Sequence, residues 1–248
     1  MTAAITFTPC AGKMNGELTN LACFPGEYVR LNVPEFIGDA AQPCTPLDMG
    51  ATWSSLGQGA WRSTGQTVGE LSYQLDVLPA FDYVDLEASV TNESVRHWTH
   101  SFAFNCCNCG PATPLRDHEG MRFWGRANGS FRRLVTMHRR FNPRPTVQVY
   151  SAVGAPAADE FGFMAKFLAT SNVVLEGWLA LRSRDGTCLA ATVSKPAGFL
   201  FHNLEFSCVH SAPSFGPLAP GQTCHARTRL YFVQASLEAW HARMTGEF

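Results

Sequence analysis

Cysteine and histidine residues occur at two places in the sequence with spacings that suit a metal ion. Cys106 and Cys109 form a C-x-x-C pair, the spacing with which one turn can present two thiolates to one ion. Cys208 and His210 lie two residues apart, about 7 Å along an extended strand, and therefore on the same face of it. If the two segments are neighbouring strands, the four side chains form a Cys/Cys/Cys/His set, for which zinc is the most suitable divalent metal.

Other interpretations of these residues stay open. Reduced cysteine is among the most buried residue types and often packs as a small hydrophobic side chain, and two adjacent thiols can form an adventitious disulfide. Thioredoxin-like redox chemistry fits less well, because its C-x-x-C opens a helix after a strand, whereas Cys109 runs into Gly110-Pro111. The sequence therefore predicts a Cys/His cluster that either holds a divalent metal or consists of packed thiols.

Arginine residues cluster in an acid-free stretch between Glu119 and Asp159, and a strand over residues 131–140 would carry several of them. Guanidinium groups bind carboxylates and phosphates in a bidentate manner, so the cluster suits an anionic small molecule or oligosaccharide, such as a sugar acid. The arginines that we expect to bind this ligand are Arg122, Arg133 and Arg140. The alternative is that the arginines pair with acids elsewhere, such as Asp82, Asp85 or Glu87.

Acid–base catalysis on such a ligand needs a titratable side chain within reach of it. The candidates are His138, His202 and Tyr150, and Trp178 is a candidate for stacking on a sugar ring. No motif of a serine hydrolase, a phosphate-binding loop, a dinucleotide-binding fold or a zinc protease occurs in the sequence. The chemistry must therefore be inferred from single residues and their grouping.

The elements that would position these residues are strands. Apolar and polar residues alternate with period two over Leu71–Val77 and over Val84–Val90, with a turn between them. Further expected strands cover 98–106, 146–153, 173–181, 189–193, 199–210 and 226–233. Proline and glycine clusters separate these runs, and helical runs between them are missing, which favours an all-β antiparallel β-sandwich over a parallel α/β fold.

One helix and one long loop complete the expected organisation of a single domain over residues 1–248. The helix is predicted at about 236–245, because Ser236 can cap it and Leu237, Trp240 and Met244 share one face. Residues 35–66 are rich in glycine, serine and proline, and we interpret them as a long ordered loop that packs over the sandwich.

Two short segments resemble strand endings and turns of sugar-processing β-sandwiches, including galactose-mutarotase-like folds. They are Val90-Thr91-Asn92-Glu93-Ser94 and Leu218-Ala219-Pro220-Gly221-Gln222. The resemblance covers only these turns and assigns no catalytic residue. The expected sandwich is therefore either a jelly roll or a galactose-mutarotase-like supersandwich.

Composition limits the possible partners. Hydrophobic residues make up 46% of the chain and the formal net charge is −1, so no overall field attracts nucleic acid or an anionic membrane surface. No run approaches the about 18 apolar residues of a membrane span. The N-terminus lacks the basic and apolar regions of a signal peptide. We therefore expect a cytoplasmic protein, in which the nine cysteines stay reduced.

Two hypotheses about function follow from these observations. In the first, the protein is an enzyme on an anionic sugar or related hydroxy acid, with lyase, epimerase or isomerase chemistry. In the second, it is a non-catalytic module that binds carbohydrate or protein, with Trp53, Trp61 and Trp178 as contact residues and a structural Cys/His metal site. A pocket that holds histidine and arginine together favours the enzyme, whereas a flat aromatic strip favours the module.

Overall fold

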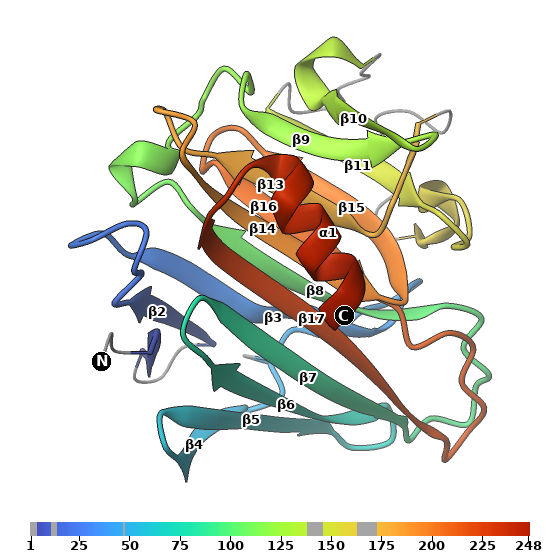
Figure 1. Ribbon diagram of the computed structural model, residues 1–248. Helices are drawn as coiled ribbons and strands as arrows, with labels where there is room; N and C mark the ends of the chain where they lie inside the picture. Colours follow the sequence, from blue (N-terminus) through green and yellow to red (C-terminus); the bar gives the residue numbers. More distant parts are fainter. Residues whose placement is uncertain (1–3, 11–13, 47, 138–145, 163–172) are drawn as a thin grey trace.

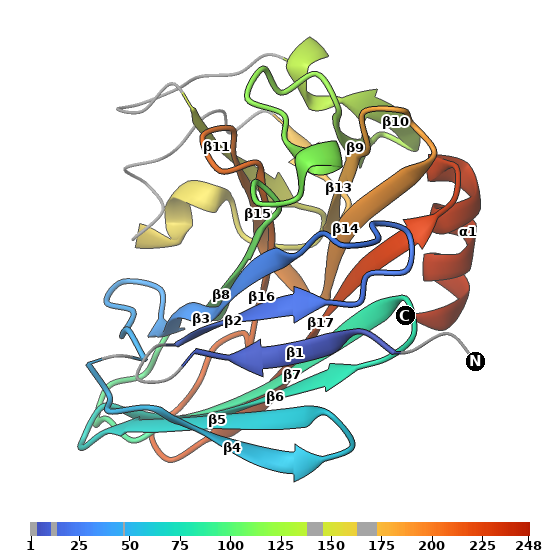
Figure 2. The same cartoon turned by 90° about the vertical axis from the view of Figure 1, so that its left-hand side faces the viewer.

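The computed structural model describes residues 4–10, 14–46, 48–137, 146–162 and 173–248. Two β-sheets pack face to face (Figure 1 and Figure 2). The strands of the first sheet are β4 (Thr52–Gly57), β5 (Ala60–Thr67), β6 (Leu71–Pro79), β7 (Tyr83–Asn92), β9 (Phe123–Ala127), β10 (Ser130–Arg133), β13 (Trp178–Arg182), β14 (Cys188–Lys195) and β17 (Thr223–Gln234). This nine-stranded sheet has the order β10-β9-β13-β14-β17-β7-β6-β5-β4.

The second sheet has eight strands. They are β1 (Thr6–Pro9), β2 (Asn15–Thr19), β3 (Val29–Asp39), β8 (Ser101–Asn108), β11 (Val147–Ala152), β12 (Val174–Leu175), β15 (Ala197–Asn203) and β16 (Cys208–Pro213). Their order is β1-β2-β3-β8-β16-β15-β11-β12. Within the described residues, β11 and β12 pair in parallel and the other ladders are antiparallel. Short 3-10 helices cover Thr113–Leu115, Leu134–Thr136 and Ala158–Glu160.

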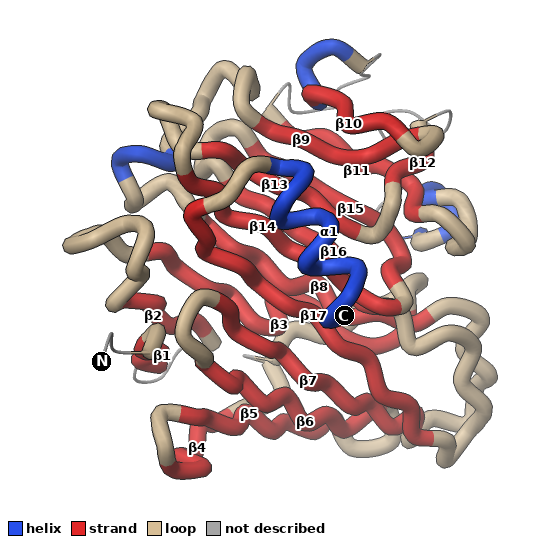
Figure 3. Tube along the Cα trace, in the orientation of Figure 1, coloured by secondary structure: helices blue, strands red, loops and turns tan. Residues whose placement is uncertain are grey.

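Alternation along the strands fills the space between the two sheets. Leu71, Tyr73, Leu75 and Val77 of β6 are buried there, while the intervening polar residues face outward. The same pattern holds for β7, and residues of both sheets form one continuous core. Strand dominates the described chain (Figure 3), and the prediction of an all-β antiparallel sandwich is confirmed.

The predicted C-terminal helix is also confirmed. Helix α1 spans Leu237–Glu247, and the Ser236 hydroxyl accepts a hydrogen bond from the Ala239 N–H at 3.1 Å. Trp240 and Met244 pack on the outer face of the nine-stranded sheet, over β13, β14 and β17 (Figure 1). Among the described residues, no helix is both long and apolar enough to cross a membrane.

The predicted loop over residues 35–66 is wrong, because much of it is strand. Strand β3 continues to Asp39, and β4 and β5 form a hairpin closed by Gln58 and Gly59. Both turn residues have positive φ, 52° and 79°, as a type I′ hairpin turn requires. The strand signal was weak because β4 lies at the edge of the sheet and is largely exposed, so it carries no apolar alternation.

Three predicted strands also need correction. Residues 173–181 divide between β12 of the eight-stranded sheet and β13 of the nine-stranded sheet. Residues 199–210 form a hairpin of β15 and β16 rather than one strand, and the turn at 204–207 contains neither glycine nor proline to mark it. The predicted strand over 131–140 ends at Arg133, where a 3-10 turn begins. His138 and Arg140 lie outside the described residues.

Candidate functional site

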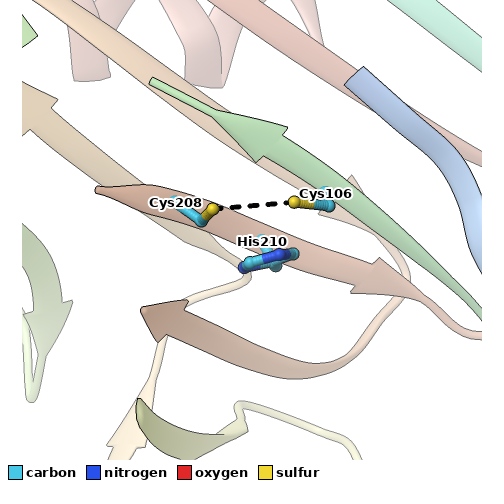
Figure 4. A group of neighbouring side chains, drawn as sticks. All are labelled: Cys106, Cys208 and His210. Carbon is cyan, nitrogen blue, oxygen red and sulfur yellow. Dashed lines mark hydrogen bonds between the residues drawn. The ribbon is translucent and has the colours of Figure 1, made fainter. Parts of the chain in front are cut away.

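The structure brings Cys106, Cys208 and His210 together on the eight-stranded sheet (Figure 4). The two sulfur atoms are 3.7 Å apart. The possible ligand atoms of all three residues lie within 4.8 Å of one another. The side chains are 6%, 3% and 2% exposed, respectively, so the cluster is shielded from bulk water.

Strand register explains this grouping. Cys107 pairs with Val209 and Asn108 pairs with Cys208, so the next position along places Cys106 opposite His210. Cys208 is the diagonal neighbour of Cys106 on the same face. This is the outer face of the eight-stranded sheet, because the alternate residues Cys107 and Val209 belong to the core between the sheets.

His210 is held in one orientation. Its Nδ1–H donates a hydrogen bond to the Phe201 carbonyl oxygen at 3.0 Å. The ring stacks on Phe104, with a centroid distance of 4.6 Å, and meets the edge of Phe201 at 4.9 Å. Because Nδ1 carries the proton in this arrangement, the lone pair of the neutral imidazole is on Nε2.

Charge interactions within the cluster favour a thiolate at Cys106. Hydrogen bonding with Cys208 lowers the pKa of Cys106 well below its ordinary value, against the effect of burial, and His210 lowers it further. The same bond and burial raise the pKa of Cys208. Burial lowers the pKa of His210, but the negative charges of Cys106 and Glu35 outweigh it, so the net shift is upward. The cluster therefore combines an acidic thiol with a basic imidazole.

Glu35 is the nearby acid that sequence reasoning missed. It lies in an irregular stretch of β3, where the register against β8 shifts between Asn32, opposite Cys106, and Phe36, opposite Phe104. Such bulges redirect side chains and often accompany functional sites. Burial, followed by the Cys106 charge, raises the pKa of Glu35 to about 7, although His210 opposes this shift.

Cys109, the fourth predicted ligand, does not join this group. Its sulfur lies 3.8 Å from that of Cys107, and both residues are buried in the core between the sheets. The C-x-x-C spacing therefore places Cys106 and Cys109 apart. All nine cysteines are free thiols.

The predicted catalytic residues His202 and Tyr150 lie inside the sandwich. Both are fully buried, and the His202 ring stacks on Phe123 of the opposite sheet at a centroid distance of 5.0 Å. The single strand expected over 199–210 would place His202 and His210 on one face, but the hairpin turn places His202 on the inner face and His210 on the outer face.

The arginine stretch is also arranged differently from expectation. Arg122 donates hydrogen bonds to the carbonyl oxygens of Pro114 at 2.9 Å and Arg182 at 2.7 Å, and it also bonds to that of Arg116. Arg133 ends β10 with an exposed side chain. The acids proposed as alternative partners pair elsewhere, Asp82 with Arg243 and Asp85 with Arg227 and Arg229.

The tryptophans do not form an exposed strip. Trp178 is 1% exposed and packs against Trp240 of α1 at a centroid distance of 5.0 Å. Trp53 and Trp61 are partly buried against the core between the sheets, and Trp53 meets Phe7 edge to face at 5.2 Å. These positions assign the three rings to packing.

An open pocket of about 350 Å³ lies on the outer face of the nine-stranded sheet, across β6, β7, β17 and β14. Its volume is in the range of ligand pockets, about 300–1,000 Å³. The side chains that matter for chemistry are Asp76, Glu87, Lys195, His225 and Arg227. Sequence reasoning missed it, because these residues are the outward, polar positions of alternating strands and resemble an ordinary solvated face.

Two titratable groups in this pocket are uncommitted. Asp76 accepts two hydrogen bonds of 2.6 Å from Arg62, and Arg227 donates to Asp85 at 2.6 Å. Within the described part of the chain, neither Glu87 nor His225 makes a side-chain hydrogen bond or ion pair. Glu87 lies opposite Arg227, and His225 lies opposite Ser89. The acid and the imidazole are therefore diagonal neighbours, whose Cα atoms are about 7–8 Å apart.

No protein-family model matches the sequence, and no curated protein matches it. Solved structures with a similar fold include an α-N-acetylgalactosaminidase from Bifidobacterium bifidum, with 9% identity, a TM-score of 0.53 and coverage of 99% of this chain but 38% of that one. A galactose mutarotase related enzyme from Lactobacillus acidophilus has 8% identity, a TM-score of 0.47 and coverage of 90% and 88%. A galactose mutarotase-like protein from Lactobacillus casei has 11% identity, a TM-score of 0.44 and coverage of 92% and 100%.

The likeness to the B. bifidum enzyme extends over 99% of this chain and agrees with the β-sandwich described above. At such identities the likeness concerns the fold alone, so the residues of the chain itself must support any proposal about activity. The chain spans only 38% of the B. bifidum enzyme, which contains further parts.

Proposed function

We propose that this protein is a cytoplasmic sugar epimerase that interconverts the anomers of an aldose in the pocket across β6, β7, β14 and β17. The observation that carries the proposal is the pairing of an uncommitted carboxylate, Glu87, with an uncommitted imidazole, His225, in one pocket. An acid and a base placed on opposite sides of a sugar suffice for this reaction, because only protons and one ring bond change.

The reaction follows from the two groups. Glu87 removes the proton from the C1 hydroxyl group, and the electrons of the breaking C1–O5 bond go to the ring oxygen. Protonated His225 donates a proton to that oxygen, which opens the ring. Rotation about C1–C2 and closure by the reverse steps give the other anomer and restore both side chains. The diagonal separation leaves room for the C1 end of the sugar between the two groups.

The proposal includes an anionic sugar, as the arginine cluster between Glu119 and Asp159 suggested, although different residues supply the charge. Lys195 and Arg227 line the same pocket as Glu87 and His225. Arg227 is shared with Asp85, whereas the Lys195 ammonium meets the Phe248 carbonyl oxygen and lies 5.5 Å from the Phe248 ring. Lys195 is therefore the cation proposed to bind a sugar carboxylate.

The test measures the rate of mutarotation of glucose, galactose, glucuronate and galacturonate by polarimetry. Glu87→Gln and His225→Gln should each lower kcat by about 10²–10⁴, the range of general acid–base catalysis. Glu119→Gln is the matched control, because Glu119 is exposed and lies outside the pocket. Lys195→Met should raise KM for the two uronates far more than for the neutral sugars.

Equal activity of wild type and Glu87→Gln would overturn the assignment of the base. A protein that binds these sugars but does not accelerate mutarotation of any of them would contradict the enzyme and support the binding module instead.

A further inference from the structure

The Cys106/Cys208/His210 cluster belongs to a different part of the molecule from the sugar pocket. The pocket lies on the outer face of the nine-stranded sheet, and the cluster lies on the outer face of the eight-stranded sheet. The proposed sugar chemistry uses none of its three side chains. Two thiols and an imidazole that converge while nearly fully buried therefore need a separate explanation.

The distances fit a tetrahedral metal ion. Zinc binds thiolate sulfur at about 2.3 Å, which in a tetrahedral site separates two sulfurs by about 3.8 Å. The Cys106 and Cys208 sulfurs are 3.7 Å apart, and the whole set of ligand atoms lies within 4.8 Å. A disulfide would need the sulfurs at about 2.05 Å, so that bond is not formed here.

The imidazole is prepared as a ligand. Metal-bound histidine usually donates its second N–H to a carbonyl or carboxylate, which fixes the ring and the tautomer. His210 has this arrangement through Nδ1 and the Phe201 carbonyl oxygen, and the Phe104 ring stacks on it with an interplanar angle of 3°. Nε2 is therefore the coordinating atom.

We propose that Cys106, Cys208 and His210 bind one zinc ion through two thiolates and a neutral imidazole. The ion would neutralise two thiolate charges and join β8 to β16 beside their paired residues Cys107 and Val209. Three protein ligands leave the fourth tetrahedral position open, as in catalytic rather than structural zinc sites. Glu35 lies on the neighbouring strand β3, and its charge interacts with Cys106 and His210.

A second thiol pair in the same segment supplies an internal control. Cys107 and Cys109 have their sulfurs 3.8 Å apart, but they face the core between the sheets, and no histidine belongs to a metal-binding group with them in the described chain. If close thiols alone were enough for metal uptake, both pairs would bind. The proposal requires that only the pair with His210 does.

The test is to strip the reduced full-length protein with a chelator and titrate it with Zn²⁺ and, separately, with Co²⁺. One ion per chain is expected, with a sulfur-to-cobalt charge-transfer band. Loss of a residue that only hydrogen-bonds to a metal ligand weakens metal binding by about 10–100-fold. Cys208→Ser and His210→Gln remove a ligand itself, so each should weaken zinc binding by more than that. Cys109→Ser should bind like wild type, and zinc should raise the Tm of wild type and Cys109→Ser.

X-ray absorption of the zinc-loaded wild type determines the zinc ligands directly, so this measurement does not depend on whether a variant folds. Two sulfur ligands and at least one nitrogen ligand are expected. No stoichiometric zinc, unchanged affinity in Cys208→Ser, or a different sulfur count would each overturn the site. A disulfide between Cys106 and Cys208 in protein prepared under reducing conditions would also overturn it.

Discussion

The side-chain amide of Asn92 donates a hydrogen bond to the backbone carbonyl oxygen of Leu218, 3.0 Å away, although the two residues are 126 positions apart. The same NH₂ group donates to the Arg96 carbonyl oxygen at 2.7 Å, and the side-chain oxygen of Asn92 accepts a hydrogen bond from the Ser94 backbone N–H. Asn92 is fully buried. One side chain therefore joins the end of β7 to the loop that precedes β17.

Asn92→Asp should destabilise the protein, because a carboxylate of the same shape cannot donate these two bonds. The Leu218 carbonyl oxygen keeps its bond from the Trp98 N–H, so the expected loss is that of the two side-chain bonds, about 0.5–1.5 kcal/mol each. Urea unfolding measures the change. Asn20→Asp is the control, because the Asn20 amide makes only an exposed bond to Thr6, and its change should stay within about 0.5 kcal/mol. Equal effects of the two substitutions would contradict the assigned role.

Asp85→Asn should lower the free energy of unfolding by about 3–5 kcal/mol, the cost of removing one partner of a buried ion pair. Asp85 accepts bonds of 2.7 and 2.9 Å from Arg229, which is nearly buried and lies 3.9 Å from the Tyr83 ring centroid. Glu17→Gln breaks the exposed pair with Arg30 and should cost at most about 1 kcal/mol. Chemical denaturation of both variants checks the contrast.

Trp178→Ala should destabilise the fold by about 3–5 kcal/mol, as truncation of a buried aromatic residue does. The reason is loss of packing between β13 and helix α1, where Trp178 contacts Trp240. Thermal unfolding measures the effect, and Trp178→Phe should recover part of it. A variant that keeps its stability but loses sugar affinity would instead support the predicted stacking role.

Arg122→Met should destabilise the protein and weaken binding of neutral and anionic sugars equally, if at all. Its guanidinium holds the loop around Pro114 to the end of β13 at Arg182, and hydrogen bonds from charged groups contribute about 1.5–3 kcal/mol each. Arg133→Met, at an exposed position, should change stability by less than about 0.5 kcal/mol. A selective loss of uronate binding in Arg122→Met would restore the predicted ligand contact.

Strands with one buried face could be predicted from the sequence, and strands without one could not. The alternation from Leu71 to Val77 predicts β6 because every second residue enters the core. Strand β4 escaped prediction because it is an exposed edge with no apolar face. The break between β15 and β16 was also missed, since the turn at 204–207 is built from residues that continue the apolar pattern, and Ser207 adopts a positive φ of 49°.

The same distinction applies to the sites. The proximity of Cys106 to Cys208 and His210 follows from alternation once the two strands are neighbours. Glu35 could not be placed, because its position depends on a register shift in β3 that no local pattern reports. The Glu87 and His225 pair depends on β7 meeting β17, a contact between distant segments that periodicity does not encode.

The central place of β17 has a consequence during synthesis. This last strand lies between β14 and β7 (Figure 1). Its Thr223 pairs with Thr91, 132 residues earlier. At about 5–20 residues per second, the ribosome needs roughly 7–26 s to span that interval. Throughout this time β7 would present an unpaired edge, and β14 would do so from its own synthesis until β17 is made. Such edges are the kind of surface on which chains aggregate. We therefore expect the nascent chain to depend on chaperones until its final strand emerges and joins the two halves of the sheet.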